Sequence, residues 1–304
     1  MILLVALLLQ AADLPSSVLE SLTSDKVFAH IAELASDSYQ GREAGTPGAD
    51  KAAEYIEGKL KEWNLAPAGV RNMYFQPFSG EGKAMKNVLA WIPGSHAALK
   101  NEYVLIGAHY DHIGAMRDGE DKVNNGADDN ASGTAVILEI ARALGTMKEK
   151  PLRSILFGWW SGEEKGLLGS KFYVESPTVN LRAVVACLNL DMVGRNAEDT
   201  IDIEGTGCSP DLRALFDRVN SRKIFKSINY GVKEVKNDTD HFHFFKAGIP
   251  AVEFFSGYHA DYHKPGDESE KITKPKLEKV ARFVSIAAWE LANSKTRPAF
   301  KKGK

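Results

Sequence analysis

Histidine and acidic residues stand directly after the apolar, strand-like runs of this sequence, at one run after another. The residues in this position are His109, Glu163, Glu164 and Asp191. In open α/β sheets, sites form in the crevice at the carboxyl ends of the strands. We therefore expect these side chains, which are far apart in the sequence, to meet at one edge of a folded sheet.

The apolar pattern alternates between two kinds of segment. Short apolar runs bounded by turn residues predict strands at 87–92, 103–107, 154–159, 183–190, 200–204 and 251–255. Apolar residues at helical spacing predict helices at 24–34, 46–60, 132–144, 165–173, 210–220 and 273–292. Several strand runs are apolar on both faces, as expected for strands buried between helices. The alternation predicts an α/β fold, a three-layer sandwich around a mixed, mostly parallel central sheet.

The composition is that of an ordinary globular protein. The chain has 304 residues, of which 44% are hydrophobic and 26% charged, without a linker, repeat or low-complexity segment. We expect one catalytic domain over residues 13–294. The formal net charge of -2 gives no reason to expect nucleic-acid binding. The basic segment 295–304 is expected to be a solvated, frayed end.

The first residues form an apolar run over 1–12 that resembles the central region of a secretory signal. The run is too short to span a bilayer, and no other segment is long and apolar enough to do so. It has no basic residue at its start and no clear cleavage site. We favour a signal, and hence a secreted or periplasmic protein; an apolar N-terminal helix packed on the body is the alternative.

The chain has two cysteines, Cys187 and Cys208. Cys187 lies in an apolar, strand-like run, so a buried free thiol is the simplest expectation. A disulfide between the two residues remains open.

The first chemical motif is His109-Tyr110-Asp111. A histidine that ligates a metal usually donates its second ring N–H to a carboxylate, which fixes the tautomer and the ring orientation. The carboxylate of Asp111 is placed to accept that hydrogen bond. We therefore assign His109 as a metal ligand and Asp111 as its support.

Two adjacent acids, Asp128 and Asp129, stand in a Gly-rich turn at the start of a predicted helix. One acid is enough to cap a helix. The second favours a carboxylate directed outward, which can bridge two cations, and we assign this role to Asp129.

Glu163 and Glu164 are also adjacent, so their side chains point in different directions. We assign Glu164 as a metal ligand and Glu163 as the general base that accepts a proton from water. Acids favoured in the first turn of a helix are the simpler explanation of such a pair.

Asp191 ends an apolar run, where an acid is costly to bury without a partner, and a metal ion is one such partner. The segment 258–265 adds His263, which we assign as a ligand, and Tyr262, whose hydroxyl is placed to donate to a developing oxyanion. The role of His259 stays open. The pair Asp240–His241 is expected to shape the pocket rather than to bind metal.

Two histidines and three carboxylates form a mixed nitrogen and oxygen set that suits a pair of zinc ions. Over residues 32–272 the sequence resembles the di-zinc aminopeptidases of the bacterial leucyl type, a family that includes glutamate carboxypeptidases and glutaminyl cyclases. The resemblance implies a zinc-dependent exopeptidase fold. It also implies these roles: one zinc on His109 and Asp191, the other on Glu164 and His263, Asp129 as the bridge, and Glu163 as the base.

The function implied is that of a metal-dependent aminopeptidase. It would hydrolyse the N-terminal bond of peptides with a free N-terminus, using water activated by two zinc ions per chain. The alternatives are a glutaminyl cyclase-like acyltransferase, which needs one zinc, and a receptor-like binding scaffold without activity. A carboxypeptidase for acidic dipeptides would need basic pocket residues that we do not place. Phe254, Phe255 and Tyr258 are candidates to line the pocket, although the two phenylalanines equally suit a core.

Overall fold

The computed structural model describes residues 13–116 and 122–302, which include one mixed β-sheet. Its strands are β1 (Ala66–Pro67), β2 (Phe75–Gly80), β3 (Lys83–Ile92), β4 (Tyr103–His109), β5 (Ser154–Trp160), β6 (Val184–Leu190), β7 (Thr200–Glu204), β8 (Ser227–Asn229) and β9 (Ala251–Phe255). Their order across the sheet is β1-β3-β5-β4-β6-β9-β7-β8, and β2 pairs with β3.

The centre of the sheet is parallel and its flanks are mostly antiparallel. Strands β5, β4, β6 and β9 run parallel to one another. On one side β3 pairs antiparallel with β5, and on the other β7 pairs antiparallel with β9. The predicted mixed α/β sheet is thus confirmed, and its parallel part is the centre. The carboxyl ends of four neighbouring strands therefore lie at one edge.

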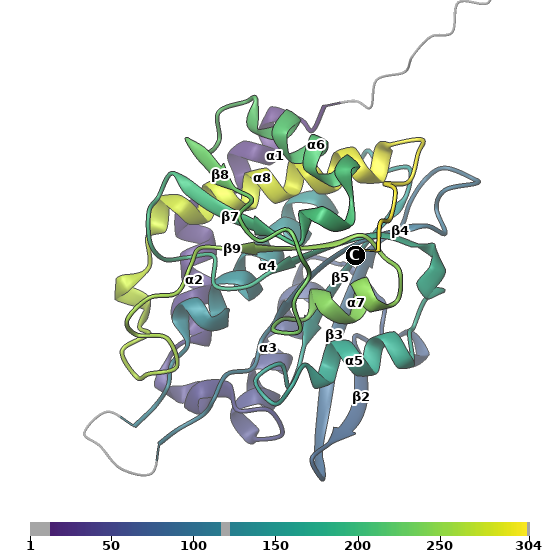
Figure 1. Ribbon diagram of the computed structural model, residues 1–304. Coiled ribbons are helices and arrows are strands. Elements are labelled where there is room, and N and C mark those ends of the chain that lie inside the picture. The colour runs from purple at the N-terminus through teal and green to yellow at the C-terminus, as the bar shows by residue number, and fades with distance from the viewer. Residues whose placement is uncertain (1–12, 117–121, 303–304) are drawn as a thin grey trace, which may run out of the picture.

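Helices cover both faces of the sheet (Figure 1). They are α1 (Ser16–Ser21), α2 (Ser24–Leu34), α3 (Pro47–Glu62), α4 (Gly133–Gly145), α5 (Leu168–Glu175), α6 (Pro210–Asn220), α7 (His241–Lys246) and α8 (Lys274–Asn293). Helices α5 and α7 pack together on one face, and α2, α4, α6 and α8 form the main layer on the other. Every residue of β4, β5 and β6 is buried, as expected for strands between two helix layers.

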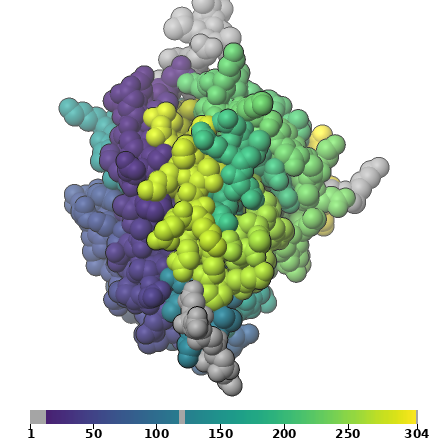
Figure 2. Space-filling model, turned by 90° about the vertical axis from the view of Figure 1, so that its left-hand side faces the viewer, coloured from purple at the N-terminus to yellow at the C-terminus, as the bar shows by residue number. Residues whose placement is uncertain are grey.

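Helix α2 near the N-terminus and helix α8 near the C-terminus lie side by side in the thicker helix layer. Helix α2 packs against α8, and Figure 2 shows the N-terminal region in purple beside the C-terminal region in yellow. The ammonium group of Lys274 lies 3.6 Å from the ring centre of Phe28, at the start of α8. This helix layer covers one face of the sheet.

The six predicted strands and six predicted helices all exist, with shifts at their ends. Strand β3 begins at Lys83 rather than at 87, because it forms a hairpin with β2. Helix α5 begins at Leu168 rather than at 165, since Gly166 and Leu167 have φ angles of +93° and +60°, which are not helical. The short elements β1, β2, β8, α1 and α7 were not predicted.

The C-terminal segment differs from the expected frayed end. Within the described part, Arg297 pairs with Glu102 at 2.8 Å, and the Lys301 N–H donates to the carbonyl oxygen of Cys208 at 2.7 Å. The side chain of Arg297 thus finds an acidic partner and the main chain of Lys301 a carbonyl partner on the body of the protein. Residues 1–12, where a secretory signal is predicted, lie outside the described residues.

Both cysteines are buried free thiols, as expected for the simpler alternative. Among the helices that the structure describes, none has the combined length and apolar character that a bilayer span requires.

One buried arginine ties the N-terminal region to the loops at the strand ends. Arg42 is 1% exposed and donates to four carbonyl oxygens. They belong to Leu34, Tyr110, Asn125 and Gly126, at 2.6–2.9 Å. Burial lowers the pKa of Arg42 to about 10, so the side chain stays charged at neutral pH. Arg42 thus holds the segment after β4 and the turn before α4 in one position.

We expect Arg42→Met to lower the free energy of unfolding by at least about 2 kcal/mol, because buried carbonyl groups lose their donor. Urea denaturation followed by circular dichroism measures the change. The matched control is Arg218→Met, which removes an ion pair to Glu290 from a side chain that is 60% exposed. It should cost less than about 1 kcal/mol. Equal effects of the two substitutions would contradict the role of Arg42.

Candidate metal centre

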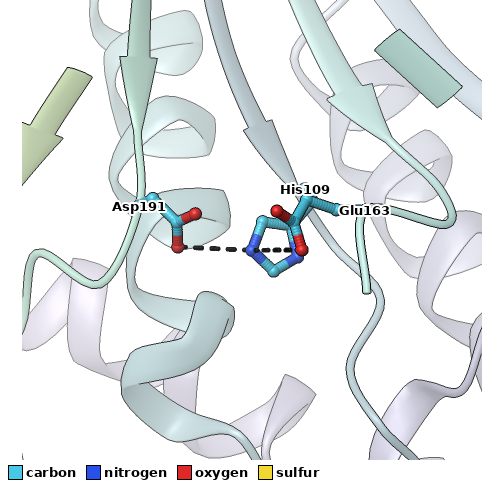
Figure 3. Close-up of side chains that lie close together, drawn as sticks. All are labelled: His109, Glu163 and Asp191. Atoms are coloured by element: carbon cyan, nitrogen blue, oxygen red, sulfur yellow. Dashed lines mark hydrogen bonds and ion pairs between the residues drawn. The ribbon is translucent and has the colours of Figure 1, made fainter. Parts of the chain in front are cut away.

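The sheet brings residues from separate strand ends to one place. His109 is the last residue of β4, Asp191 directly follows β6, and Glu163 follows β5 after a turn. Figure 3 shows dashed lines from the ring of His109 to the carboxylates of Asp191 and Glu163. The expected meeting of these side chains at the carboxyl ends of parallel strands is what the structure shows.

His109 is the centre of the first group of donor atoms. Its Nε2 atom lies 3.2 Å from Oδ1 of Asp191, 3.4 Å from Oδ1 of Asp129 and 4.0 Å from Oε2 of Glu163. The ring is 1% exposed. Its Nδ1 atom donates to the backbone carbonyl oxygen of Asp111 at 3.1 Å, which leaves Nε2 as the atom that faces the carboxylates.

His263 is the centre of the second group. Its Nε2 atom lies 3.1 Å from Oδ2 of Asp129 and 3.1 Å from Oε2 of Glu164. Asp129 therefore directs one oxygen to His109 and the other to His263. A carboxylate placed in this way joins the two groups of donors, as a bridging ligand would.

The spacing of these donors fits a metal ion of the size of zinc. Zinc binds nitrogen and oxygen donors at about 2.0–2.2 Å, so neighbouring ligands of a tetrahedral ion lie about 3.3 Å apart. Four of the contacts above, from His109 and His263 to carboxylate oxygens, measure 3.1–3.4 Å. The residues that could hold metal are His109 with Asp191, and Glu164 with His263, on either side of Asp129.

A turn with an unusual backbone directly precedes the two adjacent glutamates. Gly162 has a φ angle of +76°, a conformation that favours glycine. The N–H of Glu163 donates to Oδ1 of Asp111 at 3.2 Å. As a result, Glu163 points to the His109 group and Glu164 to the His263 group, which is the division that their adjacency predicts.

The acidic turn before α4 is held from two sides. Oδ2 of Asp267 accepts hydrogen bonds from the N–H groups of Asp128 and Asp129, both at 3.0 Å. Asp128 in turn accepts from the N–H of Gly194 at 2.6 Å, so it is used for structure while Asp129 faces the site. The peptide bond from Asp129 to Asn130 is cis.

The predicted support for His109 needs a correction. The carboxylate of Asp111 lies 3.8 Å from Nδ1 of His109, while the backbone carbonyl of the same residue accepts the hydrogen bond. The carboxylate accepts the N–H of Glu163 instead. Asp111 thus orients the histidine through its main chain and the turn that carries Glu163 and Glu164 through its side chain.

His112 belongs to the site and was not predicted. It is fully buried, and its Nδ1–H donates to Oε1 of Glu164 at 2.9 Å. One carboxylate oxygen of Glu164 therefore accepts from His112, and the other faces His263. The signal was present in the sequence, since His112 directly follows the His109-Tyr110-Asp111 motif.

Tyr262 lines the cavity beside His263, and the role predicted for its hydroxyl stays a prediction. Its ring stacks on His263 with centroids 3.8 Å apart. Burial, followed by the charges of Asp129 and Glu164, raises the pKa of Tyr262, so its hydroxyl keeps its proton and remains a donor.

Burial and mutual repulsion shift the titration of the carboxylates. Burial raises the pKa of Glu163 well above its ordinary value, and the nearby Asp191 adds to this. Burial also raises the pKa of Asp191, to about 6. Burial would equally raise the pKa of Glu164, but the hydrogen bonds from His112 and His263 outweigh it and lower that pKa. The two adjacent glutamates thus differ in acidity.

The other predicted residues take different positions. His259 lies 3.4 Å from Oδ2 of Asp128, in the network behind the acidic turn. Phe254 is buried in the core against Phe216 and Phe283. Phe255 and Tyr258 line the cavity in front of the site, as predicted for a pocket.

This cavity has a volume of about 100 Å³ and opens directly over the candidate ligands. It is lined by Asp129, Glu163, Glu164, Asp191, Met192, Glu204, Lys236, Asp238, Thr239, Glu253, Phe255, Tyr258, Tyr262 and His263. Acidic residues dominate the lining. The site is therefore accessible to a small group such as the end of a peptide.

Comparisons with known proteins agree on one family. The model of peptidase family M28 matches residues 87–288, a range that includes all five predicted ligands. The chain is 30% identical over 256 residues to leupeptin-inactivating enzyme 1 of Streptomyces exfoliatus, covering 81% of this chain and 51% of that protein. It is 30% identical over 207 residues to aminopeptidase YwaD of Bacillus subtilis, covering 65% and 43%. The chain thus spans about half the length of the curated relatives it matches.

The fold is similar to that of solved aminopeptidase structures. The structure of BSAP, a zinc aminopeptidase from Bacillus subtilis, superimposes with a TM-score of 0.73 and 19% identity, over 90% of this chain and 96% of that one. At this identity the likeness shows the shared fold.

His112 provides a test of how the candidate centre is built. We expect His112→Phe to weaken zinc binding about 10–100-fold, because Glu164 loses the partner that orients it. Competition with a chromogenic chelator measures the affinity. The control is His96→Phe, an exposed residue before β4, at the opposite edge of the sheet. A folded His112→Phe protein with unchanged zinc affinity would contradict the assignment.

Proposed function

Because this chain belongs to peptidase family M28, we propose that it is an aminopeptidase that uses two zinc ions to hydrolyse the first bond of peptides with a free N-terminus. The observation that carries the proposal is the position of Asp129, whose two oxygens face His109 and His263 at 3.4 and 3.1 Å. A bridging carboxylate between two histidine-containing groups favours two ions over one.

The donor set fits these ions in kind as well as in spacing. His109 and Asp191 would hold one zinc, Glu164 and His263 the other, and Asp129 both. Two bound zinc ions would lower the pKa of water, polarise the peptide carbonyl and stabilise developing negative charge.

Glu163 is the residue that we assign to proton transfer. Its carboxylate lies beside the His109 group and lines the cavity, where a water molecule reaches it. It accepts a proton from that water as the oxygen attacks the carbonyl carbon. It then returns the proton to the amine nitrogen as the C–N bond breaks, so that one water molecule is consumed for each bond. Its raised pKa brings the carboxylate closer to working pH.

The cavity supports action at the end of a chain. It is small, and the carboxylates of the candidate metal centre that line it, among them Glu163 and Asp191, favour the positively charged α-ammonium group of a peptide. The hydroxyl of Tyr262 remains protonated and lines the same cavity, so we assign it as a donor to the carbonyl oxygen in the transition state.

A panel of aminoacyl p-nitroanilides tests the reaction. We expect release of the free amino acid, loss of activity with a chelator, and recovery when zinc is added back. Metal analysis of the recovered enzyme should give two zinc ions per chain. An N-terminal glutamine peptide is the control: cyclisation with ammonia release and one zinc would support a cyclase instead. Bound zinc without turnover of any substrate would support a binding scaffold.

The base is tested by Glu163→Gln, which keeps the shape of the side chain. Turnover should fall at least about 100-fold, since general-base catalysis contributes about 10²–10⁴. Zinc content should stay the same, because Glu163 is not among the assigned ligands. Glu175→Gln, the same change at an exposed position of α5, should leave turnover unaltered. Near-normal turnover of Glu163→Gln would remove the assignment.

A further inference from the structure

The cavity contains acidic residues that the proposed reaction does not use. Glu204, Asp238 and Glu253 line it together with the candidate ligands, and Lys236 is the lysine among its lining residues. Glu204 comes from β7, Glu253 from β9, and the other two from the segment before α7. They form a wall of the cavity beside the metal centre, which we call the acidic wall.

Glu253 is the most unusual member of this wall. It is 5% exposed, and its one polar contact within the described residues is Nδ1 of His241 at 3.9 Å. Burial lowers the pKa of His241 to about 3, so this ring is neutral at neutral pH. Burial, followed by the charges of nearby acids, raises the pKa of Glu253 well above its ordinary value. Because Glu253 lines the cavity, a cation bound there would supply the partner that stabilises its charged form.

Glu204 stands directly opposite Glu253. The two residues are partners in the antiparallel register of β7 and β9, which places both side chains on the same face of the sheet. Like charges in opposed positions destabilise a sheet. Both residues also line the cavity, so a cation bound there would lie against the two carboxylates and remove the repulsion.

The charge of the wall exceeds what a peptide N-terminus supplies. Three carboxylates and one lysine leave a formal charge of -2. Lys236 is exposed and forms no ion pair with these carboxylates among the described residues. A substrate with a neutral first side chain brings a single positive charge, its α-ammonium group, whereas one that begins with lysine or arginine brings two.

The rest of the cavity suits a long side chain with a charged end. Met192, Phe255 and Tyr258 provide apolar surface next to the acidic wall. The rings of Phe255 and Tyr258 pack with centroids 5.0 Å apart. Lysine and arginine bury their methylene groups along such surfaces while the charged group finds polar partners.

We propose that the acidic wall selects peptides whose N-terminal residue is lysine or arginine, with Glu253 and Glu204 binding the charged end of that side chain. This inference rests on the proposed aminopeptidase function and adds its substrate class. The metal centre performs the cleavage, and the acidic wall determines which residue is released.

The test compares arginyl and citrullyl p-nitroanilides, which have nearly the same shape and differ in the side-chain charge. The zinc-loaded wild-type enzyme should show a kcat/KM at least about 10-fold higher for the arginyl substrate, because its guanidinium forms charge-assisted hydrogen bonds with carboxylates and the neutral citrulline side chain does not. Glu253→Gln should reduce this ratio about 10-fold and change hydrolysis of leucyl p-nitroanilide little. Glu234→Gln, an exposed acid in the same loop region, is the matched control for a change in overall charge.

Inhibition of the wild-type enzyme by free L-arginine and L-citrulline gives a second measurement that needs no variant, and arginine should be the stronger inhibitor. Equal rates for the arginyl and citrullyl substrates would overturn the inference. So would a Glu253→Gln enzyme that loses activity equally on all substrates. Leucyl hydrolysis without an arginyl preference leaves the proposed function intact, whereas hydrolysis of no aminoacyl substrate contradicts that function itself.

Discussion

The repulsion between carboxylates gathered in one small cavity is the constraint on which the structure depends. Asp129, Glu163, Glu164 and Asp191 lie within hydrogen-bond or ion-pair distance of two histidines, and burial removes most of the solvent that would screen them. Such a cluster needs cations to be stable and a rigid frame to keep its geometry. The histidines supply part of the positive charge, and bound metal would supply the rest.

The frame is built from the main chain. Arg42 holds the carbonyl groups of two loops, Asp267 holds two N–H groups of the acidic turn, and Asp128 holds the segment after β6. Each of these charged side chains bonds to backbone groups. The loops are therefore fixed while the side chains of the candidate ligands stay free to bind metal. The parallel centre of the sheet supplies the rest, because it brings the ends of β4, β5 and β6 to one edge.

The sequence predicts the parts of this site that follow from strand ends. His109, Glu163, Glu164 and Asp191 come after apolar runs, and the sheet rule is enough to bring them together. The exact use of Asp111 could not be predicted, because it depends on which of several nearby atoms has the better hydrogen-bond direction. His112 was missed, although its position directly after the His109-Tyr110-Asp111 motif was a signal. The start of α5 was misplaced because the helical pattern gives no sign of the two positive φ angles at Gly166 and Leu167, which delay the helix to Leu168.

The acidic residues of the cavity fall into two sets that differ in their neighbours. Those near His109 and His263 form mixed nitrogen and oxygen groups with the spacing of metal ligands. Glu204 and Glu253 are opposite each other in the register of β7 and β9. The imidazole near this pair is that of His241, which is neutral. An oxygen-only pair at this position suits an organic cation with several N–H donors. Because the two sets lie on different strands, substitutions in β7 and β9 would change the preferred side chain of the proposed substrate while the ends of β4, β5 and β6 would keep the proposed reaction.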